Sequence, residues 1–100
     1  SNTYVMIDIS QELVEEKIIE VIKEIADTLE MEVSIDSNSC PGLMPGITSQ
    51  VLVTVMGRLE KKLNVVIPDD CYVFFDKKEK KQLDIKKSAE KLIKNANYGK

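Results

Sequence analysis

A serine at the expected start of an amphipathic helix constrains this chain more than any other feature. Gly46-Ile47-Thr48-Ser49-Gln50 opens an apolar run at helical spacing that closes at Ile67-Pro68-Asp69. This run predicts a helix over residues 48–62, capped by Thr48 or Ser49, that buries Leu52, Val55, Met56, Leu59 and Leu63. A phosphate on Ser49 would be favoured there, because a helix N-terminus offers unpaired N–H groups and the positive end of the helix dipole.

Two further helices are expected from the same kind of pattern. The first covers residues 11–30 after the N-cap Ser10, with apolar residues Val14, Ile18, Val21, Ile22, Ile25 and Leu29 facing the core. The last covers residues 85–96 after the N-cap Asp84 and buries Ile85, Ala89, Leu92 and Ile93.

The segments between these helices differ in character. Residues 31–47 are rich in Ser, Asn, Pro and Gly, which indicates a long loop of the kind that is often functional. Residues 69–75 fit either a short helix capped by Asp69 or an extended segment. We therefore predict an all-α fold, a small bundle of three main helices plus this short element, with a long loop between the first two helices.

Composition indicates one domain in a chain of 100 residues that is 43% hydrophobic and 31% charged. We expect an N-terminal tail over residues 1–9, the domain over 10–97 and a C-terminal tail over 98–100. Ser1-Asn2 is interpreted as an expression scar and Met6 as the native start. The chain has no apolar run near the about 18 residues of a membrane span, and no signal peptide pattern. We expect a cytoplasmic monomer that does not bind membranes.

Charge is divided unevenly along the chain. Residues 1–70 hold 13 acidic and 5 basic side chains, a net charge of −8, whereas residues 71–100 hold 4 and 9, a net of +5. A net acidic chain with few aromatic residues argues against nucleic acid as a ligand. The basic run over residues 77–81 is expected to be a solvated loop, with a docking surface for an acidic partner as the alternative.

The chain lacks the residues that several kinds of catalytic site require. The chain has no histidine, so a Ser-His-Asp triad is impossible, and Cys40 and Cys71 have no metal-binding spacing. We expect both cysteines to be reduced structural thiols; a redox pair or a nucleophilic Cys40 would need a depressed pKa. Glu15, Glu16, Glu20 and Glu24 are expected on a solvated helix face, not as paired acid/base catalysts. We do not expect an enzyme.

The chain resembles an acyl or peptidyl carrier protein in four features. These are the spacing from Ser49 to Pro68, the apolar pattern between them, the Ile67-Pro68-Asp69 closure and Leu83-Asp84-Ile85 at the last helix. The resemblance covers residues 11–95. It implies that Ser49 bears a covalent 4′-phosphopantetheine arm, which is donated by coenzyme A through a phosphopantetheinyl transferase. The arm's thiol would carry acyl intermediates as thioesters between acyl-loading and acyl-processing enzymes. The chain would then be a phosphoprotein of fatty acid biosynthesis or of a specialised lipid or secondary-metabolite pathway.

Some positions depart from the pattern of this family. Thr48 and Gln50 occupy the places that usually hold aspartate and leucine beside the serine. This favours an alternative, an unmodified helical protein–protein interaction module that has lost the prosthetic group. Arg58, Lys61 and Lys62 make the second helix basic where the family is acidic, so exchanging them for glutamate should improve docking to general fatty-acid enzymes.

Gly57 lies inside the second helix, where glycine costs about 1 kcal/mol relative to alanine. Close helix packing is the favoured explanation. The alternative is that the missing side chain opens space for an acyl chain between helices, as in the interior cavity of the carrier family.

Overall fold

The structure is a computed structural model that describes residues 9–98. The expected N-terminal tail therefore lies outside the described residues except for Ile9, and so do the interpretations of Ser1-Asn2 and Met6. Gly99 and Lys100 at the other end also lie outside them. Tyr98, the first residue of the expected C-terminal tail, belongs to a short strand.

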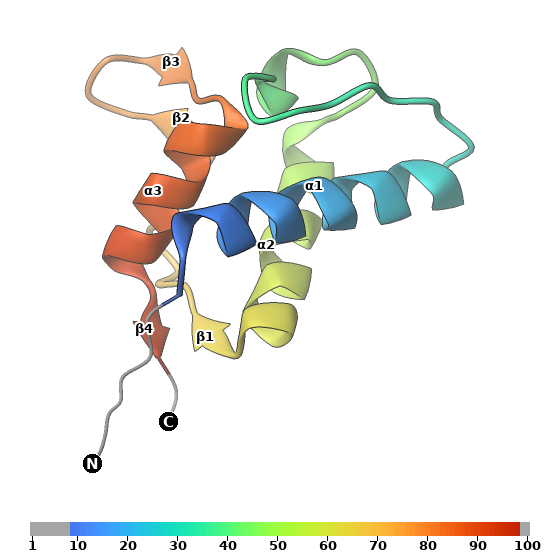
Figure 1. Ribbon diagram of the computed structural model, residues 1–100. Helices are drawn as coiled ribbons and strands as arrows, with labels where there is room; N and C mark the ends of the chain where they lie inside the picture. Colours follow the sequence, from blue (N-terminus) through green and yellow to red (C-terminus); the bar gives the residue numbers. More distant parts are fainter. Residues whose placement is uncertain (1–8, 99–100) are drawn as a thin grey trace.

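Three α-helices dominate residues 9–98: α1 (Gln11–Thr28), α2 (Ser49–Leu63) and α3 (Ile85–Asn95). The predicted N-caps are confirmed, because Ser10 accepts a hydrogen bond from the Leu13 amide and Asp84 accepts one from the Lys87 amide. Helix α1 lies across both α2 and α3, which begin toward the top of the view and end toward the bottom (Figure 1). The three helices therefore enclose one core, to which α1 contributes the central element.

The core contains most of the side chains that the helical patterns predict. Buried residues are Val14, Ile18, Val21, Ile22 and Ile25 from α1, Leu52, Val55 and Leu59 from α2, and Ile85, Ala89 and Leu92 from α3. Met56, Leu63 and Ile93 pack at its edge. Leu29 is an exception: it is the C-cap of α1 and is 49% exposed, so the prediction that it faces the core is wrong.

The predicted bundle of three main helices is confirmed, but the fold is not all-α, because two short antiparallel pairs of strands accompany the helices. Strand β1 (Val65–Val66) pairs with β4 (Asn97–Tyr98), and β2 (Phe75–Asp76) pairs with β3 (Lys81–Gln82). The first pair forms because Asn64 adopts a left-handed conformation that ends α2 and turns the chain back. β-Branched and aromatic residues then favour the extended backbone.

The short element over residues 69–75 is not a helix. A turn closed by the Cys71 amide on the Pro68 carbonyl leads into Val73 and Phe74, both fully buried, and then into β2. The capped-helix alternative is therefore wrong, and the extended alternative holds only for Phe75, since turns occupy residues 69–70 and 73–74. Tyr72 and Phe74 stack edge to face, with ring centroids 6.0 Å apart. The segment thus supplies core residues that the helical patterns do not include.

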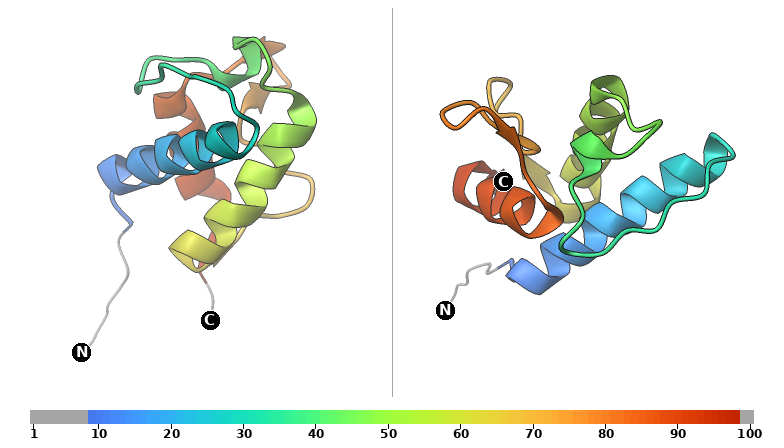
Figure 2. Two further views of the ribbon diagram at one scale, coloured as in Figure 1. Left: turned by 90° about the vertical axis from the view of Figure 1, so that its right-hand side faces the viewer. Right: turned by 90° about the horizontal axis from the view of Figure 1, so that it is seen from above.

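The long loop between α1 and α2 is packed against the C-terminal half of the chain. It doubles back over α1 to the start of α3 (Figure 2) and contains one turn of 3-10 helix, η1 (Pro41–Leu43). The Ile85 amide donates to the Ser39 carbonyl at 2.9 Å, and the Lys86 amide donates to the Ser37 carbonyl at 3.0 Å. Loop carbonyls therefore satisfy amides in the first turn of α3 that a helix cannot satisfy itself.

Candidate functional site

Thr48 and Ser49 have different positions at the start of α2. Thr48 is the N-cap: its backbone is extended and its hydroxyl accepts a hydrogen bond from the Val51 amide at 3.2 Å. Ser49 is the first helical residue. Of the two capping residues that the sequence allowed, Thr48 is the one that caps the helix. The Ser49 hydroxyl is thereby free of that structural task.

Ser49 is exposed, and its hydroxyl makes no hydrogen bond to any residue in the described part of the chain. The amides of Ser49 and Gln50 likewise find no acceptor among residues 9–98. The first turn of α2 contains no acidic side chain. An accessible hydroxyl, open amide donors and the positive end of the helix dipole fit a phosphodiester on Ser49.

The chain before Ser49 holds this helix start in place. Gly46 has a φ of +84°, a conformation that glycine adopts without the strain caused by a Cβ atom. Ile47 is buried, and its amide donates to the Met44 carbonyl at 3.1 Å. Ile47 and Leu52 both lie in the core at the two positions of a hydrophobic staple, which fixes the direction in which the chain enters a helix.

A hollow beside the start of α2 is lined by uncharged residues. An open hollow of about 460 Å³ separates the end of α1 from the start of α2, and it is lined by Ile25, Leu29, Thr48, Gln50, Val51, Val53 and Thr54. Leu29 is 49% exposed and Val53 is 57% exposed. Two large apolar side chains thus lie at the surface beside the candidate attachment point. The sequence pattern had assigned Leu29 to the core and left Val53 without a role.

Gly57 does not serve close packing. A Cβ atom added there would have no neighbouring atom within 4 Å outside its own helix, so the packing explanation is wrong. Gly57 instead lines a hollow of about 280 Å³ between α2 and the segment from Ile67 to Tyr72. Apolar parts of Val53, Met56 and Ile67 contribute to its walls, together with the Glu60 carboxylate. The alternative explanation, space for an acyl chain between helices, stays a prediction, because this hollow lies between α2 and a segment that is not helical.

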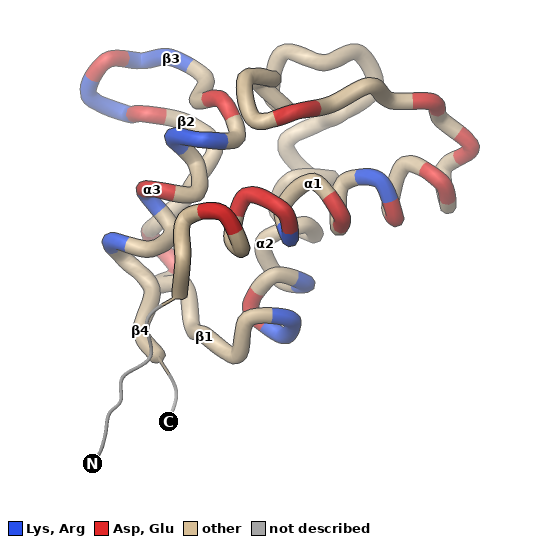
Figure 3. Tube along the Cα trace, in the orientation of Figure 1, with Lys and Arg blue, Asp and Glu red and all other residues tan. Residues whose placement is uncertain are grey.

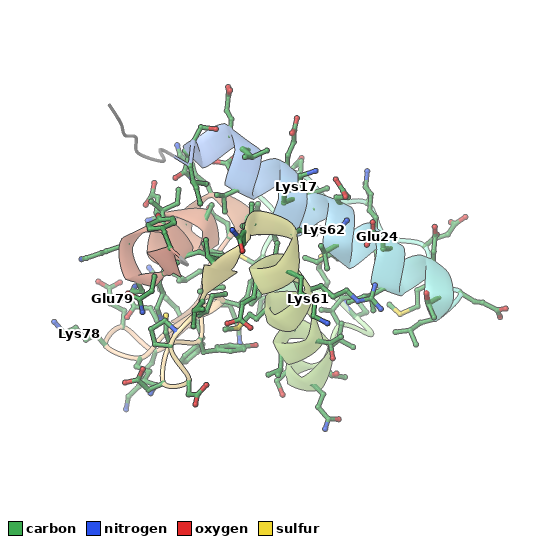
Figure 4. All side chains as sticks on the ribbon, turned by 90° about the horizontal axis from the view of Figure 1, so that it is seen from below. Lys17, Glu24, Lys61, Lys62, Lys78 and Glu79 are labelled. Carbon is green, nitrogen blue, oxygen red and sulfur yellow. The ribbon has the colours of Figure 1, made fainter. Side chains whose placement is uncertain are left out.

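Ion pairs join the acidic face of α1 to the basic end of α2. The Lys62 ammonium lies 2.7 Å from a Glu20 carboxylate oxygen and 3.3 Å from one of Glu24, and Arg58 lies 3.9 Å from Glu24. Lys17 adds a contact to Glu20 at 3.1 Å. Figure 4 shows Lys17, Lys62 and Glu24 close together, with Lys61 apart from them. Glu20 and Glu24 therefore lie on a solvated face, as predicted, and also form ion pairs between α1 and α2.

These contacts shift the pKa values of Glu20 and Lys62. The hydrogen bond from Lys62, followed by that from Lys17, lowers the pKa of Glu20 below its ordinary value of 4.5. The hydrogen bonds to Glu20 and Glu24 raise the pKa of Lys62 above its ordinary value of 10.5. Both shifts favour the charged forms, as expected for a structural ion pair and not for a catalytic carboxylic acid.

Both cysteines are free thiols. Burial, the largest contribution, raises the pKa of Cys71; nearby Lys91 lowers it and Asp70 raises it. A raised pKa reduces the thiolate fraction, which is the opposite of what a nucleophilic cysteine requires. Within residues 9–98, no cluster of three or more Cys, Asp or Glu side chains could hold a metal ion. No helix in that same range is long and apolar enough to cross a membrane.

Comparisons with known protein families, with curated proteins and with solved structures give no match to this chain.

Proposed function

We propose that this chain is an acyl-carrier-type protein whose Ser49 accepts 4′-phosphopantetheine from coenzyme A. The main support for this proposal is that Thr48, and not Ser49, caps α2. The Ser49 hydroxyl is exposed and has no hydrogen-bond partner among the described residues. When bound, the group supplies a thiol at the end of a flexible arm, on which acyl intermediates are carried as thioesters.

In the transfer step, this chain supplies only the Ser49 hydroxyl as the nucleophile. The Ser49 oxygen forms a bond to the phosphorus of the pantetheine phosphate, and the pyrophosphate bond of coenzyme A breaks to release adenosine 3′,5′-bisphosphate. A separate phosphopantetheinyl transferase takes the hydroxyl proton, since the chain contains no histidine to act as a base. The chain is a carrier without catalytic activity of its own, and acyl-loading and acyl-processing enzymes perform the chemistry.

The hollow at Gly57 is the proposed shelter for part of the cargo. It has a volume of about 280 Å³ and mixed apolar and polar walls, and it opens on the side of α2 that faces the segment after Pro68. In this proposal the chain is a monomer in the cytoplasm and serves a specialised lipid or secondary-metabolite pathway. Arg58 and Lys62 are paired with α1, and the first two turns of α2 carry no charged side chain, so partners would meet an uncharged part of α2 next to Ser49.

Intact mass measures the transfer directly. The purified chain is incubated with coenzyme A, magnesium and a broad-specificity phosphopantetheinyl transferase, beside a known carrier protein as a positive control. We expect wild type to gain one phosphopantetheine and Ser49→Ala to gain none. Ser34→Ala is the matched control, because Ser34 is an exposed serine in the loop before η1, and it should be modified like wild type.

A second variant separates two negative outcomes. Thr48→Asp/Gln50→Leu restores the residues that usually flank the serine in carrier proteins and keeps a side chain able to cap α2. If this variant is modified and wild type is not, wild type requires a dedicated transferase. If neither is modified while the positive control is, the carrier proposal fails and the chain is an unmodified interaction module.

A further inference from the structure

A lysine-rich furrow runs between the β2–β3 hairpin and α3. Two adjoining hollows of about 390 and 270 Å³ share Asp76, Lys91 and Asn95. The lysines that line them are Lys87, Lys91 and Lys94 from α3 and Lys77 and Lys78 from the hairpin. Figure 3 shows basic residues gathered on the hairpin and α3, whereas acidic residues follow α1. The furrow therefore lies in the positively charged part of an otherwise acidic protein.

Most of these lysines are available to a partner. Lys77, Lys78, Lys87 and Lys94 are exposed, and none forms an ion pair with another described residue. Figure 4 shows Lys78 projecting from the hairpin, on the opposite side of the molecule from Glu24. Lys91 differs, because its ammonium donates to the Phe75 carbonyl at 2.7 Å and is half-buried. Lys91 thereby fixes the hairpin to α3 and keeps the furrow in shape.

Carboxylates are interspersed among the lysines. Asp76 lies in both hollows, and one of its oxygens accepts the amides of Lys78 and Glu79 in the hairpin turn. Glu90 lines one hollow and Asp70 lines the other. A partner must therefore place its negative charges beside particular lysines and away from these three carboxylates.

We propose that this furrow binds an acidic segment of a partner protein. The separate Asp and Glu side chains of a peptide can pair with the lysines and avoid the carboxylates of the furrow. The continuous negative charge of a nucleic acid or an anionic lipid surface would also be repelled by Asp76 and Glu90. Among residues 9–98, no aromatic side chain lines either hollow for base stacking, and the apolar lining residue Leu83 is buried and therefore not placed to insert into lipid. This inference is independent of the modification of Ser49.

Fluorescence anisotropy of a short labelled peptide that alternates Glu and Ser tests the proposal, with a Gln-for-Glu peptide as the uncharged probe. We expect salt-sensitive binding of the Glu peptide only.

Lys87→Gln/Lys94→Gln should weaken binding about fivefold, as expected when two exposed charge pairs are lost. Lys77→Gln/Lys78→Gln, in the exposed hairpin turn, should give a similar loss without touching a helix. The control Lys23→Gln/Lys61→Gln changes charge equally at exposed sites on α1 and α2 and should leave binding within about twofold.

Three results would overturn the proposal. The first is no salt-sensitive binding of the Glu peptide to wild type. The second is equal weakening by the furrow variants and by the control variant, which would show a response to net charge alone. The third is tighter, lysine-dependent binding of phosphatidylserine vesicles or of an oligonucleotide than of the peptide.

Discussion

Thr48 and Ser49 occupy neighbouring positions yet are expected to respond differently to mutation. Thr48→Ala removes the acceptor of the Val51 amide and should lower the free energy of unfolding by about 1 kcal/mol. Ser49→Ala removes an exposed hydroxyl that bonds to no described residue, so its effect should stay within about 0.5 kcal/mol. Urea denaturation of both variants measures the difference. Equal losses would show that Ser49 shares the capping role.

Gly57 offers a test of the open space beside α2. Gly57→Ala should raise the free energy of unfolding by about 0.5–1 kcal/mol, because alanine favours the helix and its Cβ has no neighbour within 4 Å. Gly46→Ala is the opposite control: its positive φ and the nearby Met31 side chain should make that substitution destabilising. Thermal and urea unfolding measure both changes. A destabilised Gly57→Ala protein would mean that the helix is closely packed there after all.

At the scale of the elements, the contact between α1 and α2 depends on charge as well as on apolar burial. Arg58 and Lys62 contact Glu20 and Glu24 across the two helices, whereas Lys61 has no ion pair within residues 9–98. Exchanging all three basic residues for glutamate would place new negative charges beside Glu20 and Glu24. Improved docking would then be obscured by weaker folding, so Lys61→Glu alone is the cleaner probe of partner charge.

The pH dependence of stability follows from the same ion pairs. The pKa of Glu20 is lowered in the folded protein, so its stabilising contribution is present above its ordinary pKa of 4.5 and is lost as pH falls through the folded value. The pKa of Lys62 is raised, so its contribution is full below 10.5 and is lost as pH rises through the folded value.

We therefore expect Lys62→Gln to lower the Tm near neutral pH, and the difference from wild type to shrink below pH 4.5 and above pH 10.5. Lys61→Gln is the matched control and should leave the Tm profile unchanged. A Tm difference for Lys62→Gln that does not vary with pH would show that the ion pair is not its cause.

The helices could be predicted from sequence because their signals are local. Ser10, Thr48 and Asp84 cap the three helices, and apolar spacing identifies the buried faces. The strands could not be predicted, because each contains only two residues. The β1–β4 pair also joins distant segments, as Val65 joins Tyr98, whereas β2 and β3 form a local hairpin across a charged turn. Short strands of this kind have little pattern of their own, so their formation depends on where the helices bring the chain.

At the scale of the whole molecule, the loop before α2 connects the candidate site to the rest of the fold. Loop carbonyls accept the amides of Ile85 and Lys86 at the start of α3, whereas the amides of Ser49 and Gln50 have no acceptor among the described residues. We expect hydrogen exchange at Ile85 and Lys86 to be slower than at Ser49 and Gln50, although all four amides lie in first turns. Exchange at equal rates would contradict the docked position of the loop.

The candidate site was only partly predictable from sequence. The position of Ser49 at a helix start follows from local spacing, and the structure agrees with it. The exposure of Leu29 and the engagement of Arg58 and Lys62 depend on how α1 crosses α2, which no local pattern specifies. The surface that partners meet is therefore a property of the assembled helices.

We propose that Ser49 is the attachment point of a phosphopantetheine arm. The most direct measurement digests the protein after incubation with coenzyme A and a phosphopantetheinyl transferase, then locates any added group by tandem mass spectrometry. We expect the group on Ser49, in the peptide that contains the start of α2, and on no other serine. Attachment to another residue would contradict this proposal. So would a Ser49 peptide that stays unmodified in both wild type and Thr48→Asp/Gln50→Leu while a known carrier protein is modified in the same mixture.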